Sequence, residues 1–341
     1  MNRKVLWVIG ILVLLAASIA AYYLLTQKPP GQPLPDLLAR VPSDSAAIIY
    51  LDATSFRNSP FLKQLLNSFG QIKEDQEYVN FVRDTGFDYS RDLDRAVLFV
   101  VPPSLEKTKA GADKWTTLAL AEGRFERDKI IQHIKRNRGD SSLAEGTEIF
   151  TFGADEPLSL TFLSPTRVAI AQEKGILIRW LREAKSPPSV TGVAEYQERL
   201  VRFSDAPLIV IGRAGSLSSN PKSKNPVEDV LRGIAQNIRW YALSARPEAD
   251  RLRVALEGEC ESTLQAIQLG VLLEGAKLLL ESALKDPGAR REMKGEELAL
   301  LDHIVRNGSI HRDSNRVQLR VEFTSAQIAS LTSSGDTATD R

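Results

Sequence analysis

The stretch from Val5 to Leu25 reads VLWVIGILVLLAASIAAYYLL and contains no charged residue. A helix of this length, at a rise of about 1.5 Å per residue, spans roughly 31 Å, which matches the hydrocarbon core of a bilayer. Arg3 and Lys4 precede it, and Tyr22 and Tyr23 lie near its end, where amphipathic rings suit the headgroup region. The sequence therefore predicts a transmembrane helix over Val5–Leu25 that holds the rest of the chain beside a membrane.

Two fates of this segment are compatible with its composition. Ser18-Ile19-Ala20 has the small residues of a signal-peptide cleavage site, but the apolar run continues beyond it to full spanning length. This continuation favours an uncleaved anchor over a cleaved signal. The basic residues before the span favour a cytoplasmic N-terminus over residues 1–4. We therefore expect a single-pass protein of the cell inner (cytoplasmic) membrane with its body outside the cytoplasm.

The chain beyond the anchor divides by composition. Residues 26–36 contain KPPGQPLPD from Lys28 to Asp36, a Pro-rich linker that favours extended backbone. A first α+β unit is expected over residues 37–203 and a second over residues 204–332. The polar residues 333–341 are expected to be a disordered tail.

The strand patterns predict the type of sheet. Arg316–Phe323 (RVQLRVEF) and Arg251–Glu257 (RLRVALE) alternate apolar and polar residues. Alternation is typical of strands with one buried and one solvated face, as in antiparallel sheets covered by helices on one side. The expected fold class is therefore α+β, with an N-terminal transmembrane helix followed by two related antiparallel sheet-plus-helix units.

An internal repeat is suggested by two short matches. Glu122–Glu126 (EGRFE) and Glu257–Glu261 (EGECE) each end a predicted strand and precede a predicted helix. Arg167–Ile170 and Arg316–Leu319 each form the second strand of a predicted hairpin. The alignment places Cys260 where Phe125 lies in the first half, which predicts a buried, unreactive thiol.

A second apolar segment, Leu264–Leu284, is also as long as a membrane span. Gln268, Glu274, Lys277 and Glu281 recur along it and are interpreted as a polar stripe. Because charges in mid-span are costly in lipid, this pattern predicts a half-buried core helix of a soluble body.

Composition argues against several function classes. The 341 residues include 44 Lys plus Arg and 43 Asp plus Glu, so the basic excess of a nucleic-acid-binding protein is missing. The single cysteine excludes an internal disulfide framework. The three histidines do not have the i,i+4 spacing of a helical metal site. We expect no nucleic-acid partner, no metal and no cofactor.

Several short motifs resemble catalytic signatures but lack their partners. Asp84-Thr85-Gly86 matches half of an aspartic-protease site, without a second copy, and Gly86 reads better as the end of a helix. Ser104–Lys107 and Ser219–Lys222 match the Ser-x-x-Lys of penicillin-binding proteins, but both fall in predicted loops. Gly212–Gly215 completes no phosphate-binding loop.

Two histidines are further candidates for site residues. His133 lies on a basic predicted helix and reads as part of a solvated face. His303 lies among apolar residues and reads as a core-edge side chain with its hydrogen bonds satisfied. No catalytic, cofactor-binding or metal-binding residue is assigned, which favours a non-catalytic protein and leaves an enzyme as the alternative.

A family resemblance is carried by Val41–Ala46 (VPSDSA) and Thr85–Arg95 (TGFDYSRDLDR). With the N-terminal span, these segments resemble uncharacterised bacterial envelope proteins that contain a domain of unknown function. The resemblance implies a bacterial origin and an envelope location, and it brings no activity. Asp88 is expected to cap a short helical turn, a structural role.

These observations favour a membrane-anchored, extracytoplasmic, non-catalytic binding or assembly component of the bacterial cell envelope. The expected partners are the membrane, through Val5–Leu25, and an envelope protein or lipid that the sequence does not identify. Two alternatives remain. One is an envelope hydrolase with a site between the two halves, and the other is a lipid- or lipoprotein-handling protein with an apolar groove.

Overall fold

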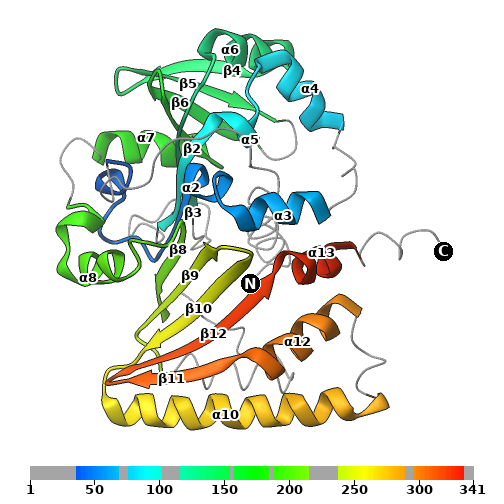
Figure 1. Ribbon diagram of the computed structural model, residues 1–341. Coiled ribbons are helices and arrows are strands. Elements are labelled where there is room, and N and C mark those ends of the chain that lie inside the picture. Colours follow the sequence, from blue (N-terminus) through cyan, green and yellow to red (C-terminus); the bar gives the residue numbers. More distant parts are fainter. Residues whose placement is uncertain are drawn as a thin grey trace. The chain divides into compact units, whose positions relative to one another are not determined.

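The computed structural model describes residues 36–68, 76–101, 116–153, 157–183, 188–214, 237–288 and 295–333. The predicted membrane helix Val5–Leu25 lies outside these residues, as do most of the predicted linker and tail. The described chain is an α+β protein with antiparallel strand pairing, which confirms the predicted fold class at that level (Figure 1).

The chain divides into two compact units. Within the described ranges, the first unit comprises residues 36–58 and 76–209, and the second comprises residues 59–68 and 210–333. The helix α3 (Pro60–Ser68) thus belongs to the second unit although it comes early in the chain. There it packs against helix α13 (Ser325–Ser333) and strand β9 (Trp240–Glu248).

The first unit is built on a sheet with the strand order β1-β2-β3-β7-β6-β5-β4. Every neighbouring pair in it is antiparallel. The strands are β1 (Ala47–Asp52), β2 (Leu93–Val101), β3 (Thr116–Gly123), β4 (Asp140–Ala144), β5 (Thr147–Phe152), β6 (Leu158–Ser164) and β7 (Arg167–Ala171). The helices are η1 (Leu38–Arg40), α2 (Ala53–Arg57), α4 (Gln76–Thr85), α5 (Tyr89–Asp92), α6 (Arg127–Arg136), α7 (Lys174–Glu183), η2 (Val190–Gly192) and α8 (Ala194–Arg202).

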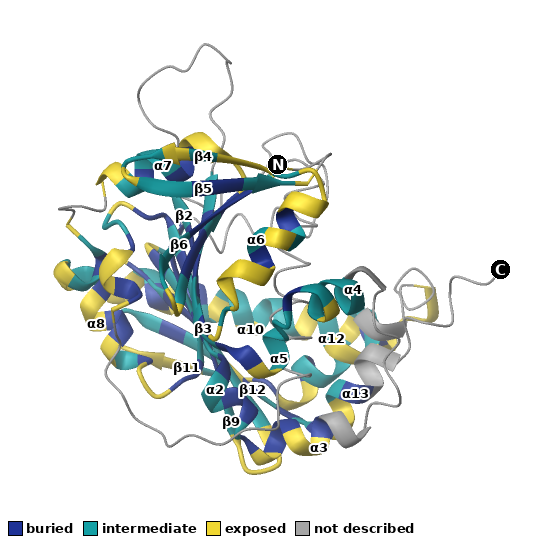
Figure 2. Cartoon of the chain, turned by 90° about the horizontal axis from the view of Figure 1, so that it is seen from above, coloured by how far each residue is buried: buried dark blue, intermediate teal, exposed yellow. Residues whose placement is uncertain are grey.

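The core of the first unit lies between sheet and helices. Figure 2 shows buried residues along its strands and mixed buried and exposed turns on α6. Ile130 and Ile134 of α6 pack against Phe150 and Leu160 of the sheet. Phe125, just before the helix, lies against the same cluster. The apolar face of α6, whose residues recur at helical spacing, therefore covers part of one side of the sheet.

The second unit has the strand order β8-β9-β10-β12-β11. Besides β9, its strands are β8 (Leu208–Arg213), β10 (Arg251–Glu259), β11 (Ser309–Asp313) and β12 (Arg316–Thr324). Besides α3 and α13, its helices are α10 (Thr263–Lys285) and α12 (Gly295–Asn307). Pairing from β9 through β10 and β12 to β11 is antiparallel, as the alternating patterns of β10 and β12 predicted.

The two units share one connectivity. The order β1-β2-β3-β7-β6 corresponds strand for strand to β8-β9-β10-β12-β11. In each, a helix follows the third strand (α6 or α10) and another follows the last strand (α7 or α13). Among the described residues, the first unit adds the hairpin β4–β5 and the helices α2, α4, α5 and α8, and the second adds α12.

The prediction that Leu264–Leu284 is a core helix is wrong for one side of that helix. Only Ala266, Leu269 and Leu284 of α10 are buried. Of the predicted polar stripe, Gln268 and Glu274 are exposed and Glu281 is partly exposed, whereas Lys277 turns inward and donates from Nζ to the Gly308 carbonyl at 2.7 Å. The side of α10 that points away from the sheet carries aliphatic residues.

Candidate functional site

Helix α10 is well defined at its start and long enough to present an extended surface. Ser262 caps it in a reciprocal box, accepting from the Gln265 N–H at 3.2 Å while the Gln265 side chain accepts from the Ser262 N–H at 3.2 Å. The helix then runs for 23 residues, about 34 Å, to Lys285.

The inner face of α10 attaches the helix to its own unit. Ala266 and Leu269 form a buried cluster with Cys260 and Val317, and α10 contacts α12, β11 and β12 (Figure 1). Cys260 is 1% exposed, and burial raises the pKa of its thiol. The prediction of a buried cysteine is therefore confirmed.

The opposite side, which we call the outer face, consists of Leu264, Ile267, Val271, Leu278 and Leu279. These residues are 64%, 38%, 68%, 66% and 70% exposed, respectively. The first four are spaced by three, four and seven residues, so they follow one line along the helix. Among the residues that the structure describes, α10 is the one helix long and apolar enough to cross a bilayer, judged by length and composition.

The outer face is energetically unusual for a surface in water. Full burial of one Leu, Ile or Val is worth about 1.5–3 kcal/mol, and these side chains forgo a large part of it. Single exposed apolar residues are common, whereas several gathered on one face indicate an interaction site. The outer face is therefore the candidate functional surface.

Polar residues border the outer face on one side. Glu274 is exposed and lies one turn from Val271 and Leu278. Glu281 accepts from Lys285 Nζ at 2.8 Å, and this hydrogen bond lowers the pKa of Glu281. The border is thus mildly acidic at Glu274 and neutralised near the end of the helix.

A polar cavity of about 590 Å³ also lies in the second unit, lined by residues of β10, β12 and α12. Arg251 and Arg253 in its wall both pair with Glu322, at 3.2 and 3.1 Å. These hydrogen bonds hold the pKa of Glu322 below its ordinary value. The two arginines are thus already engaged by a carboxylate of the same wall.

His303 contributes to this cavity as a satisfied side chain, as the sequence predicted. Its Nε2 lies 2.7 Å from the Glu322 carbonyl and its Nδ1 lies 3.1 Å from Asn307 Nδ2. The ring also lies against Phe323, with centroids 4.7 Å apart. With both nitrogens engaged, His303 is held in place as part of the wall.

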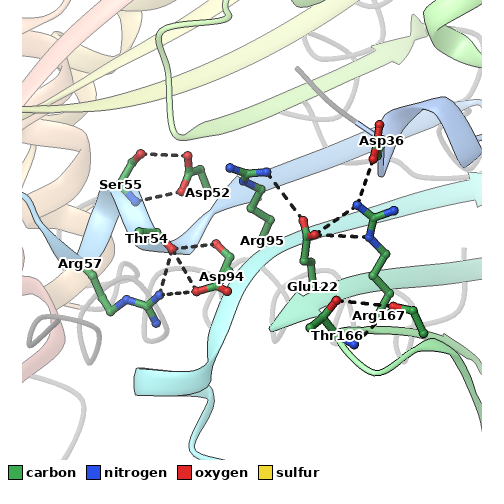
Figure 3. A network of polar contacts seen from close by, with 11 residues as sticks. Asp36, Asp52, Thr54, Ser55, Arg57, Asp94, Arg95, Glu122, Thr166 and Arg167 are labelled. Atoms are coloured by element: carbon green, nitrogen blue, oxygen red, sulfur yellow. Dashed lines mark hydrogen bonds and ion pairs between the residues drawn. The ribbon is translucent and has the colours of Figure 1, made fainter. Parts of the chain in front are cut away.

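An extended polar network occupies the first unit (Figure 3). The guanidinium of Arg57, which is 2% exposed, reaches Asp94 Oδ1 at 3.2 Å and Thr54 Oγ1 at 3.0 Å. It also donates to the Ser90 carbonyl at 3.2 Å. These contacts join α2 to the start of β2.

A second group of ion pairs crosses the strand ends. Glu122 at the end of β3 pairs with Arg95 at 3.7 Å and with Arg167 at 3.2 Å, and Arg167 reaches Asp36 at 3.1 Å (Figure 3). Asp36, Asp94 and Glu122 each form an ion pair with an arginine. The arrangement fastens β2, β3 and β7 at one end of the sheet, which is a structural role.

The segment Thr85–Arg95 has the structural role that the sequence predicted, since it ends one helix and begins the next. Gly86 adopts φ +72° and its N–H bonds to the Val82 carbonyl at 2.7 Å, which confirms that it ends helix α4. Asp88 caps α5 by accepting from the Ser90 N–H at 2.7 Å, as predicted. Asp92 is buried and accepts from the Asp88 N–H at 2.9 Å.

The remaining motifs do not assemble a site in the described chain. Asp84 pairs with Arg83 and lies 3.3 Å from His133 Nδ1, so His133 has a carboxylate partner on α4. A Cβ at Gly212 would lie 2.3 Å from the Tyr241 ring, which explains this glycine by packing. Ser104–Lys107 and Ser219–Lys222 lie outside the described residues.

Comparisons with known proteins give only a distant structural likeness. No protein-family model matches the chain, and no curated protein matches it. Crystal form I of TP0453 is similar with a TM-score of 0.43 at 10% identity, covering 88% of this chain and 97% of that one. Crystal form III of TP0453 gives a TM-score of 0.46 at 10% identity, with 90% and 100% covered.

Proposed function

We propose that this chain is a membrane-anchored, extracytoplasmic protein of the bacterial cell envelope that acts without catalysis, as a binding or assembly component. Val5–Leu25 is its single transmembrane helix in the inner membrane. Residues 26–36 hold the two units close to that membrane. The outer face of α10 is the surface through which it binds.

The observation that carries this proposal is the outer face of α10, with its five exposed aliphatic residues. An apolar line of this kind supports a binding role, because covering it removes hydrocarbon from water. A catalytic role would need a nucleophile or acid–base pair in a cavity. Of the carboxylates in Figure 3, those of Asp36, Asp94 and Glu122 are instead paired with arginines, and that of Asp52 accepts hydrogen bonds from Ser55.

We further propose that the two units arose as related copies. Their common strand order and helix positions support this. Cys260 and Phe125 both lie after the third strand and pack against the helix that follows. The strand registers differ, since Glu122 faces Arg167 whereas Glu257 faces Gln318. A duplication followed by a two-residue shift accounts for both facts.

Lipid or lipoprotein handling is the second candidate, because the same outer face would accept an acyl chain. Its aliphatic composition suits lipid as well as protein. The two candidates differ in what lies against α10 in the native membrane, and that difference can be measured.

The test places a photo-activated cross-linking residue at Val271 of the full chain in its native membrane. Val201 on α8 is the matched control, because it is also a valine on a helix and is 69% exposed against 68% for Val271. We expect a protein adduct from position 271 and none from position 201. A lipid adduct at 271 would favour the second candidate. Equal yields at both positions would refute a binding role for α10.

A further inference from the structure

We propose that the polar cavity of the second unit binds a phosphate group, which Arg320 and Ser309 hold in place. The described residues of its wall lie on β10, β11, β12, α12 and α13 and none lies on α10, so this site goes beyond the binding role proposed for the outer face. Its volume of about 590 Å³ lies within the roughly 300–1,000 Å³ of small-molecule sites. Three arginines line it, with one glutamate among the described residues.

Two of the three arginines are already paired with carboxylates. Arg253 pairs with Glu248 at 2.9 Å and with Glu322 at 3.1 Å. Arg251 pairs with Glu322 at 3.2 Å, and its Nε lies 3.9 Å from Asp250. An anion at this end of the cavity would therefore have to displace a carboxylate that belongs to the chain itself.

Arg320 differs from the other two arginines because no described carboxylate pairs with it. In the strand register its neighbours are Ala255 on β10 and Ser309 on β11, and neither carries a charge. Gln318 accepts from Arg320 Nε and donates to Glu257 Oε2 at 3.5 Å, so the contact of Arg320 with that carboxylate is indirect. The Nη groups of Arg320 therefore keep their N–H donors for a ligand.

Ser309 supplies a second donor beside Arg320. The two residues are directly opposite each other in the β11–β12 ladder, so their side chains lie on the same face with Cβ atoms about 4.5–5.5 Å apart. The Ser309 hydroxyl lies 3.0 Å from His311 Nε2. When that nitrogen carries the proton, the Ser309 oxygen accepts it and its own O–H can donate to an anion. A guanidinium and a hydroxyl can thus bind one oxyanion together.

The number of acceptor oxygens favours a phosphate over a carboxylate ligand. A phosphate monoester has three such oxygens and a charge of about −1.5 to −2 at pH 7. Two of them can accept from the Nη groups of Arg320 side by side while the third accepts from Ser309. A carboxylate has two oxygens, which the guanidinium occupies alone. Glu322 lies two residues further along β12 and repels an anion weakly, because two arginines already pair with it.

A soluble phosphate ester and a phospholipid headgroup present the same group, so the test includes both. Glycerol 3-phosphate is titrated into the full chain in a non-ionic detergent and a phosphate-free buffer, and the heat of binding is measured. We expect saturable binding, with acetate binding several-fold more weakly. The titration is then repeated in micelles that contain phosphatidic acid, with diacylglycerol, which lacks the phosphate, as the control lipid.

Three variants locate the bound phosphate. Arg320→Gln is expected to weaken the binding of glycerol 3-phosphate at least about tenfold, since charge-assisted hydrogen bonds are lost. Arg312→Gln is the matched control, because Arg312 is also an exposed arginine of the β11–β12 hairpin but is paired with Val317, on the opposite face of the sheet. Its affinity is expected to be unchanged. Glu322→Gln is expected to strengthen binding several-fold, because it removes the repulsion and releases Arg251 for the ligand.

Competition by phosphatidic acid but not by diacylglycerol would identify a phospholipid headgroup as the source of the phosphate. Saturable binding without such competition would identify a soluble ester, and the phosphate site stands in both cases. The absence of saturable binding would overturn the site, as would equal losses in Arg320→Gln and Arg312→Gln. Acetate binding as tight as that of glycerol 3-phosphate would refute the choice of phosphate. An affinity of Glu322→Gln no higher than that of the unchanged chain would place the bound phosphate outside this cavity.

Discussion

Two leucines on helix α10 should respond very differently to the same substitution. Leu269 is 1% exposed and lies in the cluster with Cys260 and Val317, whereas Leu278 is 66% exposed. Leu269→Ala removes fully buried atoms and leaves a cavity, which costs about 2–5 kcal/mol. At Leu278 about a third of the side chain is covered, so Leu278→Ala forgoes about 0.5–1 kcal/mol of burial. The higher helix propensity of alanine offsets part of that loss.

The assay is urea unfolding of the full chain in a mild detergent, followed by circular dichroism, with the slope m compared between variants. We expect a clear fall in the midpoint for Leu269→Ala and almost none for Leu278→Ala. Equal losses would show that both faces of α10 are packed, and the assignment of an outer face would be wrong.

Three further outcomes follow from local contacts. Gly123→Ala places a Cβ 2.3 Å from the Asp92 carbonyl oxygen and should cost at least about 1–3 kcal/mol of unfolding free energy, whereas Gly192→Ala, beside open space, should change it little. Burial alone would raise the pKa of Asp92, but the hydrogen bonds from Arg91 and the backbone together hold that pKa below its ordinary value. Asp92 therefore stabilises the fold above the unfolded pKa of about 3.9, and acid titration should show this contribution lost as pH falls through the folded value and missing in Asp92→Asn. Cys260 should react slowly with a thiol reagent in the native protein and fast in denaturant; fast native labelling would contradict its burial.

Local sequence patterns predicted part of the structure. The period-two pattern of Arg316–Phe323 indicated a strand with one wet face, and Gly86 and Asp88 marked a helix end and a helix start. These features depend on neighbours within a few residues. They can be predicted from the local sequence, because helix caps and strand alternation follow from backbone geometry.

Features that depend on contacts between distant segments could not be predicted from the sequence. Helix α10 carries apolar residues on every side, so its sequence does not reveal which side meets the sheet. The sequence predicts Lys277 in a solvent-facing stripe, yet it turns inward to Gly308, a partner 31 residues away. The placement of α3 with α13 and the cavity wall around Glu322 likewise join segments that are far apart in the chain.

The central claim is that the outer face of α10 is covered in the native membrane. It is tested most directly by the labelling rate of Val271→Cys with a water-soluble maleimide in intact membranes, compared with Val201→Cys, both freshly reduced and in the Cys260→Ala background. The account predicts that Val271→Cys reacts several-fold more slowly in membranes and that the two rates become equal after detergent extraction and dilution. Equal rates in the membrane itself would contradict it.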